Sequence, residues 1–519
     1  MKKILFIIGT LTVMLVSSSC KKSFESLQVD PNRATSVPAN LVLGGVLSDI
    51  YYGPFNSTQR WNQFYACNYA YYGDQQYTWT NMSFGAYNTL KNVLKMEEEA
   101  AKSIPAPNPY SALGKFLRAY IYYNITMQTG DVPLSEALKA IDNTTPKYDT
   151  QKEVFKQILV WLEEANTDMA AITLKGNYVL AGDIYYGNDL NKWRKAVNAF
   201  KLRVLIQLSK YEADTDLNIK TKFAQTLANS STYPLFASKT DNLQYIYNAQ
   251  YNKYPTNPDS YGFDVARYNM ASTYLNTLVN LQDPRTFFVA EPADALVKAG
   301  AQPNSFAAFR GASSGEDLAT MSANAGNGAY SFINRKRYYS TYTAENCTQI
   351  GYQEMCFNIA EAINRGWITG NAEDWYTKGI QSSISFYGIV SGANTVTFQK
   401  VGGSLADYNN YSINYDWNSY YNQPAVKYAG NTNAGLTQIL TQKYLAFYQN
   451  SGWEAYYNWR RTGAPTFLLG PGTGNSTRIP LRFQYPIAEK AVNTINVNSA
   501  IQSQFSGLDD INAKMWLIK

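Results

Sequence analysis

The sequence contains no histidine among its 519 residues. Histidine is the side chain that most often changes charge near neutral pH, and it is the commonest metal ligand. Its absence excludes Ser-His-Asp and Cys-His nucleophilic catalysis, zinc sites of the H-E-x-x-H type and haem held by histidine. Any chemistry in this protein therefore proceeds without an imidazole group.

Cysteine, net charge and long apolar runs are also scarce. The chain has four cysteines, and its 45 Lys and Arg residues nearly balance its 39 Asp and Glu residues, for a net charge of +6. So small a charge gives no electrostatic basis for nucleic-acid binding. No segment has the roughly 20 apolar residues that a membrane-spanning helix needs. We therefore expect a globular protein that is soluble apart from any anchor.

The N-terminal segment has the features of an export signal. Lys2 and Lys3 precede an apolar stretch over residues 4–16, and small residues then lead to Cys20. The stretch is too short for a membrane span and is typical of a signal peptide. A cysteine in this position resembles the lipobox of bacterial lipoproteins, although Ser17 stands where leucine is usual. We predict a signal peptide over 1–19, lipidation at Cys20 and a lipidated tether over 20–35; an ordinary secretory signal is the alternative.

The remaining cysteines do not form a recognisable set. Cys67, Cys347 and Cys356 are an odd number, which fits neither a disulfide framework nor a metal cluster. Cys356 lies on the apolar stripe of a predicted helix, where a cysteine is usually a small buried hydrophobe. A bridge between Cys347 and Cys356 remains open.

Amphipathic helices dominate much of the chain. Apolar residues recur at a spacing of three and four, which is typical of such helices. Helices are predicted over residues 110–128, 150–169, 189–211, 351–365, 372–387, 436–450 and 452–460. The many basic residues of the 189–211 helix are expected to be solvated or paired internally rather than to bind a partner.

The spacing of these helices predicts an all-α protein. Closely spaced helices form antiparallel hairpins, and hairpins separated by long insertions favour an α-solenoid scaffold with a loop layer. We expect one domain over 36–519. Its scaffold would cover roughly 36–240 with later helices at 351–388 and 436–460, and its loop-rich binding layer would cover 243–346 and 394–435.

Few residue patterns favour catalysis. Neighbouring acids at 97–99, 163–164 and 509–510 point in different directions on a helix, so they are read as surface charge rather than a glycosidase pair. Two tyrosine-rich stretches, 68–88 and 408–428, combine aromatic rings with amides and hydroxyls, a composition that suits adaptable binding surfaces. The alternative is that these tyrosines pack the loops onto the helices.

Several separated motifs occur in a fixed order along the chain. They are Leu117–Tyr120 with Gly130–Leu134, Lys192–Arg203, Asp283–Arg285, Glu354–Trp367, Tyr376–Ile380, Gln442–Lys443, Trp459–Pro465, Arg482 with Tyr485–Pro486, and Lys514–Trp516. Together they resemble the SusD/RagB family of Bacteroidetes outer-membrane lipoproteins. The resemblance implies four tetratricopeptide-like helix pairs that support an irregular binding layer.

The same resemblance implies a function without catalysis or a cofactor. The protein would capture an oligosaccharide at the cell surface and deliver it to a TonB-dependent, SusC-like transporter of the outer membrane. A peptide ligand, a glycoside hydrolase with two loop carboxylates and a purely structural surface protein are the alternatives. The motifs mark scaffold, so the expected ligand-binding residues rest on position and chemistry alone. They are Tyr72, Asp74, Trp79 and Asn81 in the first loop, and Trp417 and Tyr420 in the late loop.

Overall fold

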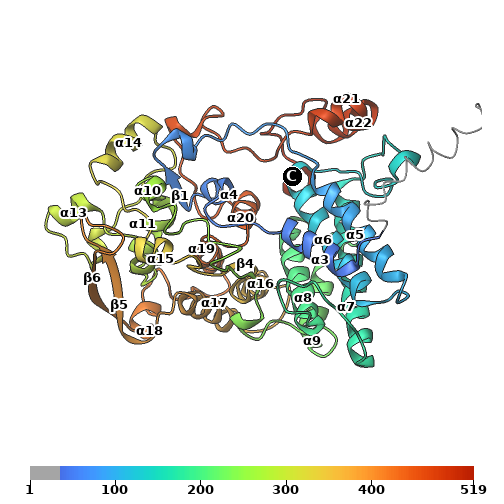
Figure 1. Ribbon diagram of the computed structural model, residues 1–519, viewed down its shortest axis with the longest axis horizontal. Helices are drawn as coiled ribbons and strands as arrows, with labels where there is room; N and C mark the ends of the chain where they lie inside the picture. The colour runs from blue at the N-terminus through green and yellow to red at the C-terminus, as the bar shows by residue number, and fades with distance from the viewer. Residues whose placement is uncertain (1–35) are drawn as a thin grey trace, which may run out of the picture.

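A computed structural model describes residues 36–519, so the predicted signal peptide, Cys20 and the tether lie outside the described residues. Figure 1 shows long helices gathered at one end of the molecule and short helices with a β-hairpin at the other. The expectation of a mostly helical, tetratricopeptide-like architecture is confirmed. Over residues 36–519, no helix is both long and apolar enough to cross a membrane.

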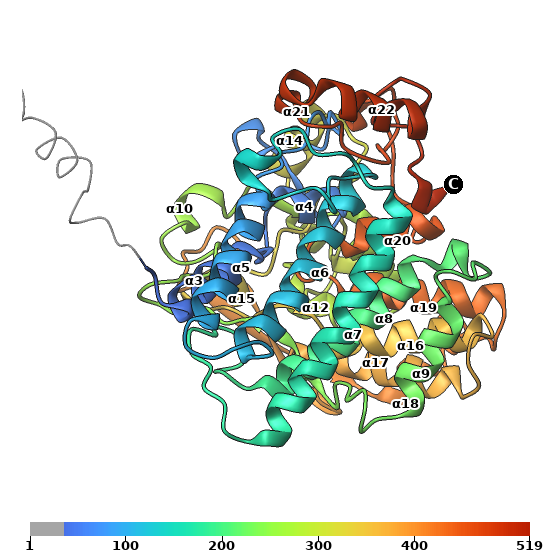
Figure 2. The ribbon, with the colours of Figure 1, turned by 90° about the vertical axis from the view of Figure 1, so that its right-hand side faces the viewer.

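The long helices form a bundle in which α6 and α7 lie side by side (Figure 2). Its members are α3 (Ala39–Asp49), α5 (Ala86–Ala101), α6 (Pro109–Thr129), α7 (Gln151–Lys175) and α8 (Leu190–Gln207), with α9 (Ile219–Ala228) packed on α8. Local sequence sets the bounds of α6. Asn108 caps its first turn by accepting from the backbone N–H groups of Tyr110 and Ser111, and Gly130 ends it at φ 102°.

A second group of helices lies in the middle of the molecule (Figure 1). It contains α16 (Tyr352–Asn364), α17 (Ala372–Phe386), α19 (Asn433–Ala446) and α20 (Glu454–Thr462). The short turn between α16 and α17 makes them the antiparallel pair that their spacing predicts. Three of the five basic residues of α8 are paired with acids: Lys195 with Asp241, Lys201 with Glu163 and Arg203 with Glu354.

The rest of the chain forms short elements. The short helices are α4 (Ser57–Trp61), α10 (Tyr261–Asp264), α11 (Ser272–Asn280), α12 (Thr286–Val289), α13 (Asp294–Lys298), α14 (Leu318–Gly326), α15 (Arg335–Tyr339), α21 (Ile487–Val492) and α22 (Thr494–Phe505). Antiparallel strand pairs are β1 (Tyr65–Cys67) with β3 (Tyr268–Met270) and β2 (Leu243–Tyr245) with β4 (Cys347–Ile350).

One stretch expected to be irregular, residues 394–435, contains regular structure. Strands β5 (Gly392–Gln399) and β6 (Tyr408–Tyr415) form an antiparallel hairpin, and α18 (Trp417–Tyr421) follows directly. Val396 and Phe398 are buried on β5, as are Ile413 and Tyr415 on β6. Their period-two spacing is the mark of a strand, but the many Asn, Ser and Thr residues between them obscured it in the sequence.

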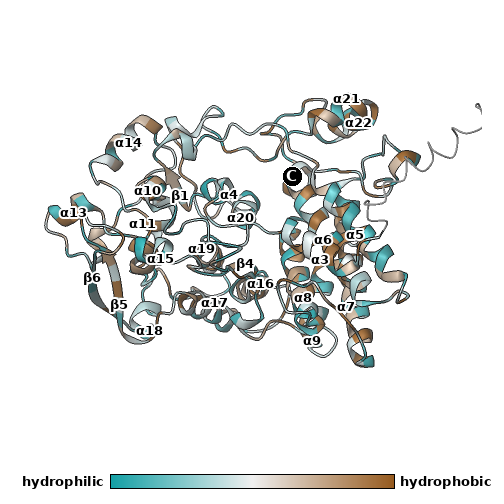
Figure 3. Ribbon diagram, viewed as in Figure 1, coloured by the Kyte–Doolittle hydropathy of each residue, from teal (hydrophilic) through white to brown (hydrophobic). Residues whose placement is uncertain are grey.

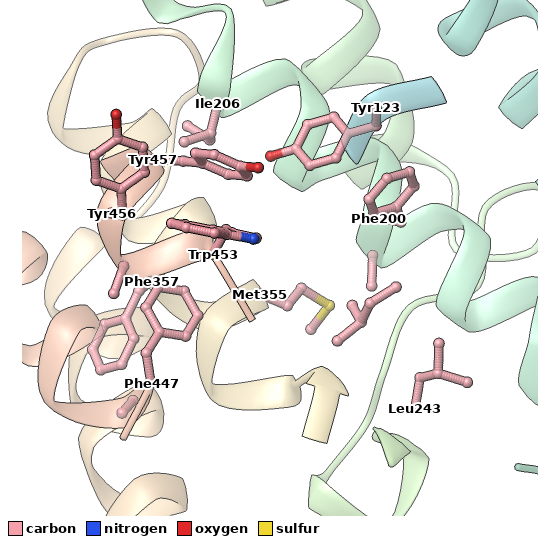
Figure 4. Close-up of a cluster of buried hydrophobic side chains, with 14 of the residues drawn as sticks. Tyr123, Phe200, Ile206, Leu243, Met355, Phe357, Phe447, Trp453, Tyr456 and Tyr457 are labelled. Atoms are coloured by element: carbon pink, nitrogen blue, oxygen red, sulfur yellow. The ribbon is translucent and has the colours of Figure 1, made fainter. Parts of the chain in front are cut away.

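Aromatic side chains make up much of the core between the helix groups. Figure 4 shows Tyr123 and Phe200 from the bundle facing Trp453 and Tyr457 of the α20 region. Along the bundle helices, hydrophobic and hydrophilic residues alternate (Figure 3), as expected of helices with one buried face. The abundance of aromatic residues therefore reflects core packing to a large extent.

Candidate functional site

Two segments that are far apart in the sequence meet at the short β1–β3 pair. Cys67, the last residue of β1, lies opposite Tyr268, the first residue of β3. Because the strands are antiparallel, the chain leaving β1 runs beside the chain entering β3. The backbone N–H of Asn68 donates to the carbonyl of Arg267 (3.2 Å), and its side chain donates to the carbonyl of Ala266 (2.9 Å).

The junction presents four aromatic side chains, which we call the aromatic ledge: Tyr69, Tyr71, Tyr72 and Phe263. Tyr71 is 83% exposed, Phe263 74% and Tyr69 52%, which is unusual for large apolar rings. The rings of Tyr71 and Tyr72 lie 5.1 Å apart edge to face, and Tyr69 is 6.3 Å from Tyr72. The hydroxyl of Tyr72 donates to the carbonyl of Phe263 (2.8 Å), which joins the two segments.

The backbone under the ledge is held by Arg60 and a glycine. Arg60 Nη1 donates to the carbonyl of Tyr72 (3.1 Å). Gly73 follows with φ 117°, and a Cβ atom there would lie 2.0 Å from Arg60 Nη1. Only glycine fits this combination of backbone angle and close approach. The loop closes where Gln75 Nε2 donates to the carbonyl of Cys67 (2.8 Å).

Charged groups of both signs border the ledge. The guanidinium carbon of Arg267 lies 5.0 Å from the centre of the Tyr69 ring, a cation–π geometry. Asp74 is half-buried, and its Oδ1 accepts from the backbone N–H of Gln76 (2.9 Å). Asp264 lies behind the ledge at 7% exposure, and burial raises the pKa of its carboxyl above the ordinary value.

This arrangement is suited to binding a ligand with both apolar and polar surfaces. Stiff aromatic rings that are exposed offer contact area at a low cost in conformational entropy. A pyranose has an apolar C–H face that can lie on such rings and hydroxyls that can hydrogen-bond to a neighbouring charged group such as Arg267. The ledge therefore has the properties expected of a saccharide-binding surface.

Two of the four residues expected in the first loop lie at the ledge, and two do not. Tyr72 and Asp74 are part of it or border it. Trp79 is a core residue at 5% exposure: its ring stacks on Phe483 at 4.4 Å and contacts Trp453 at 5.3 Å. Asn81 is used structurally, because its amide donates to the carbonyl of Tyr485 (2.8 Å). Trp79 is covered on its faces by other rings, so its expected role in stacking on a ligand does not fit its position.

The two residues expected in the late loop also serve packing. The ring of Trp417 is half-buried and stacks on Tyr421 at 5.2 Å. Tyr420 is 4% exposed, and its hydroxyl donates to Asp283 Oδ2 (2.5 Å) and accepts from Gln442 Nε2 (3.0 Å). Tyr420 touches the wall of a cavity but is committed to this buried network. Its expected role in stacking on a ligand therefore does not fit its position.

The expectation from sequence missed Tyr69, Tyr71, Phe263 and Arg267. Tyr69 and Tyr71 lie inside the tyrosine-rich stretch 68–88, but nothing in the local sequence separates exposed tyrosines from packed ones. Phe263 and Arg267 reach the ledge only through the β1–β3 pairing, which joins positions about 200 residues apart. A short strand pair of such long range leaves no local sequence signal.

The described cysteines are unbridged, and they are all buried. Cys347 Sγ contacts the carbonyls of Tyr52 (3.2 Å) and Gln449 (3.4 Å), so the open question of a Cys347–Cys356 bridge is answered by two separate thiols. Burial raises the pKa of Cys67 to about 11 and that of Cys356 to about 12, which leaves both thiols protonated at neutral pH. Within residues 36–519, no group of His, Cys, Asp or Glu is placed to hold a metal ion.

Comparison with known proteins shows which solved structures this chain resembles. A solved SusD homologue from Bacteroides fragilis is 30% identical, with a TM-score of 0.81, over 93% of this chain and 100% of its own. A protein from Bacteroides vulgatus described as a putative outer membrane protein, probably involved in nutrient binding, is 31% identical with a TM-score of 0.77 over the same shares.

A more distant structure, a chitin-binding SusD homologue from Flavobacterium johnsoniae, is 18% identical over 93% of this chain and 98% of its own, with a TM-score of 0.69, and shares the fold. No curated protein sequence matches the chain. The model of the SusD-like family described as starch-binding and associating with the outer membrane matches residues 31–486. The chain belongs to this SusD-like family.

Proposed function

We propose that this protein binds an oligosaccharide on the aromatic ledge at the cell surface and delivers it to a TonB-dependent, SusC-like transporter without cleaving it. The exposed rings of Tyr69, Tyr71 and Phe263 are the observation that carries the proposal. Rings this exposed are costly to leave in water, and a cluster of them on one surface is a feature of binding sites.

The polar groups around the ledge favour a saccharide over a purely apolar ligand. Arg267 lies over one ring and Asp74 borders the loop, so hydrogen-bonding groups stand next to the stacking surface. Stacking would supply contact area, and these groups would select the hydroxyl pattern. The starch-binding description of the family and the chitin-binding relative suggest α-glucans and chito-oligosaccharides as the first ligands to test.

The test is calorimetric titration of the mature protein with maltohexaose and chitohexaose, using Tyr71→Ala and Phe263→Ala variants. Both rings are more than 70% exposed, so their removal should leave the fold intact. We expect each variant to bind at least about tenfold more weakly, or ~1.4 kcal/mol, because a stacking face is lost. Leu174→Ala is the control, since Leu174 is 89% exposed at the end of α7, in the helix bundle.

Unchanged affinity in both ledge variants would place the ligand elsewhere. Binding of a peptide panel in place of the sugars would favour the peptide alternative, since aromatic rings beside Arg267 also suit peptides. Release of shorter products during long incubation of either hexasaccharide, abolished by Asp74→Asn, would favour a hydrolase. We expect the sugars to be recovered intact.

A further inference from the structure

A cavity of about 350 Å³ lies beside the β-hairpin. We call it the hairpin pocket. One wall is formed by residues 412–415 of β6 and by Asp416, the N-cap of α18. The other wall is formed by residues 282–287 and 304–306. Its volume lies at the small end of the range for ligand pockets, about 300–1,000 Å³, so it suits one or two sugar units better than a long chain.

The floor of the pocket is apolar and aromatic. Phe287 is 4% exposed and packs against Phe306, with ring centres 4.7 Å apart. Ile413 and Tyr415 complete the apolar lining from β6. Phe287, Ile413 and Tyr415 are almost fully buried, so the half-buried ring of Phe306 is the aromatic surface that a sugar in the pocket would contact.

The rim of the pocket carries polar groups without protein partners. The side chains of Gln282 and Asn414 are exposed, and within residues 36–519 neither is hydrogen-bonded to another residue. Both amides offer a donor and an acceptor to whatever occupies the pocket. Asp416 lies at the same rim, with its Oδ1 engaged by Ser419.

The walls are fixed before any ligand arrives. Asp416 caps α18 by accepting from the backbone N–H of Ser419 (2.7 Å), and the amide of Asn304 donates to the carbonyl of Ser412 (3.0 Å). Tyr420 is tied to Asp283 behind the pocket. Such preorganisation lowers the entropy cost of binding.

The charges of the lining restrict the ligand class. Asp416 is the charged residue among the lining side chains, and no Lys or Arg of the described chain lines the pocket. An anionic ligand would face this carboxylate without a compensating cation. We infer that the hairpin pocket is a second binding site, separate from the aromatic ledge, for a neutral saccharide unit. This inference rests on the proposed function, because it extends saccharide binding to a second place in the fold.

The two sites lie in different parts of the molecule. Figure 1 shows β1 and α10, which carry the ledge, near the top of the short-element layer, while β6 and α18 lie at its lower edge. Different elements build the two sites, so we expect a substitution in one site to leave the other intact. This separation makes each site testable alone.

The experiment measures binding of glucose, N-acetylglucosamine and glucuronate by titration in the Tyr71→Ala background, which weakens the ledge. Asn414→Trp adds bulk at the rim of the hairpin pocket. Asn410→Trp is the matched control, because Asn410 lies four residues earlier on the same face of β6 and outside the pocket. Gln282→Ala removes an amide from the opposite wall without adding bulk, and circular dichroism checks the fold of each variant.

We expect saturable binding of at least one neutral sugar in the Tyr71→Ala protein. Asn414→Trp and Gln282→Ala should each weaken it, the former at least tenfold, while Asn410→Trp leaves it unchanged and glucuronate binds at least tenfold more weakly. Loss of all monosaccharide binding in Tyr71→Ala, with hexasaccharide still bound by the unmodified protein, overturns the second site alone. Absence of saccharide binding in the unmodified protein overturns the second site and the proposed function together.

Discussion

At the scale of single residues, Gly73 decides whether the aromatic ledge can form. Its φ of 117° lies in a region that side chains rarely adopt, and Arg60 occupies the space a Cβ would need. Replacement by alanine must therefore strain the backbone and displace Arg60, which holds the carbonyl of Tyr72. Because Tyr72 joins the two segments of the ledge, we expect the strain to reach the binding surface.

We predict that Gly73→Ala lowers the free energy of unfolding by about 1–3 kcal/mol and weakens oligosaccharide binding. Thermal unfolding and calorimetric titration measure the two effects. Gly187→Ala is the control: Gly187 also has positive φ, at 61°, but no atom lies near its Cβ position. Gly187→Ala should lower the free energy of unfolding by about 1–2 kcal/mol, because of backbone strain, without changing the affinity for the oligosaccharide. Equal affinity in both variants would mean that Gly73 does not position the ledge.

At the scale of elements, buried ion pairs join helices that are distant in the sequence. Arg461 of α20 makes two hydrogen bonds to Glu361 of α16, at 2.5 and 2.9 Å, and Arg365 makes a third contact at 2.9 Å. Arg203 of α8 reaches Glu354 of the same helix α16. Apart from Arg365, the side chains of these pairs are only 0–3% exposed. Removing one partner therefore leaves an uncompensated buried charge.

Glu361 should make stability depend on pH in the acid range. Burial alone would raise the pKa of Glu361. The positive charges of Arg461, Arg365 and Lys443 outweigh this effect and lower the pKa to about 2. The folded state thus binds the proton less well than the unfolded state, whose pKa is near 4.5. The resulting stabilisation is present above about pH 4.5 and is lost as the pH falls through 2, and it amounts to about 3 kcal/mol.

We predict that Glu361→Gln is less stable than the unmodified protein at pH 7 and that the difference shrinks between pH 4.5 and pH 2. Urea unfolding at several pH values measures it. Glu98→Gln is the control, because Glu98 belongs to an exposed pair on α5 that contributes little. A stability difference that stays constant over this pH range would contradict the assigned pKa.

At the scale of the whole molecule, the predicted lipid anchor would hold the described residues at a membrane. We predict that Cys20→Ala removes the acyl group, so that the protein leaves the membrane fraction and its mass lacks the lipid. A Ser23→Ala variant is the control, since Ser23 lies in the predicted tether. A membrane fraction and mass unchanged by Cys20→Ala would show that the lipobox interpretation is wrong. We also expect a TonB-dependent channel to co-purify with the unmodified protein.

Helix patterns of the bundle could be predicted from sequence because they are local. The three-and-four spacing and the signals at Asn108 and Gly130 define α6 without knowledge of the rest of the fold. The ordered motifs likewise indicated the family. The β5–β6 hairpin was missed, because its alternating buried residues are separated by polar residues that also occur in loops.

The sequence by itself determined the absence of imidazole chemistry, the helical scaffold and the family, since each depends on composition or on neighbours along the chain. Only the tertiary structure decided which aromatic residues are available to a ligand. Trp79 and Tyr71 lie eight positions apart in one tyrosine-rich stretch, yet one is 5% exposed and the other 83%. Residues remote in sequence cover Trp79, whereas Phe263 and Arg267 reach the ledge through β3. Burial is set by these long-range contacts, and local composition does not encode them.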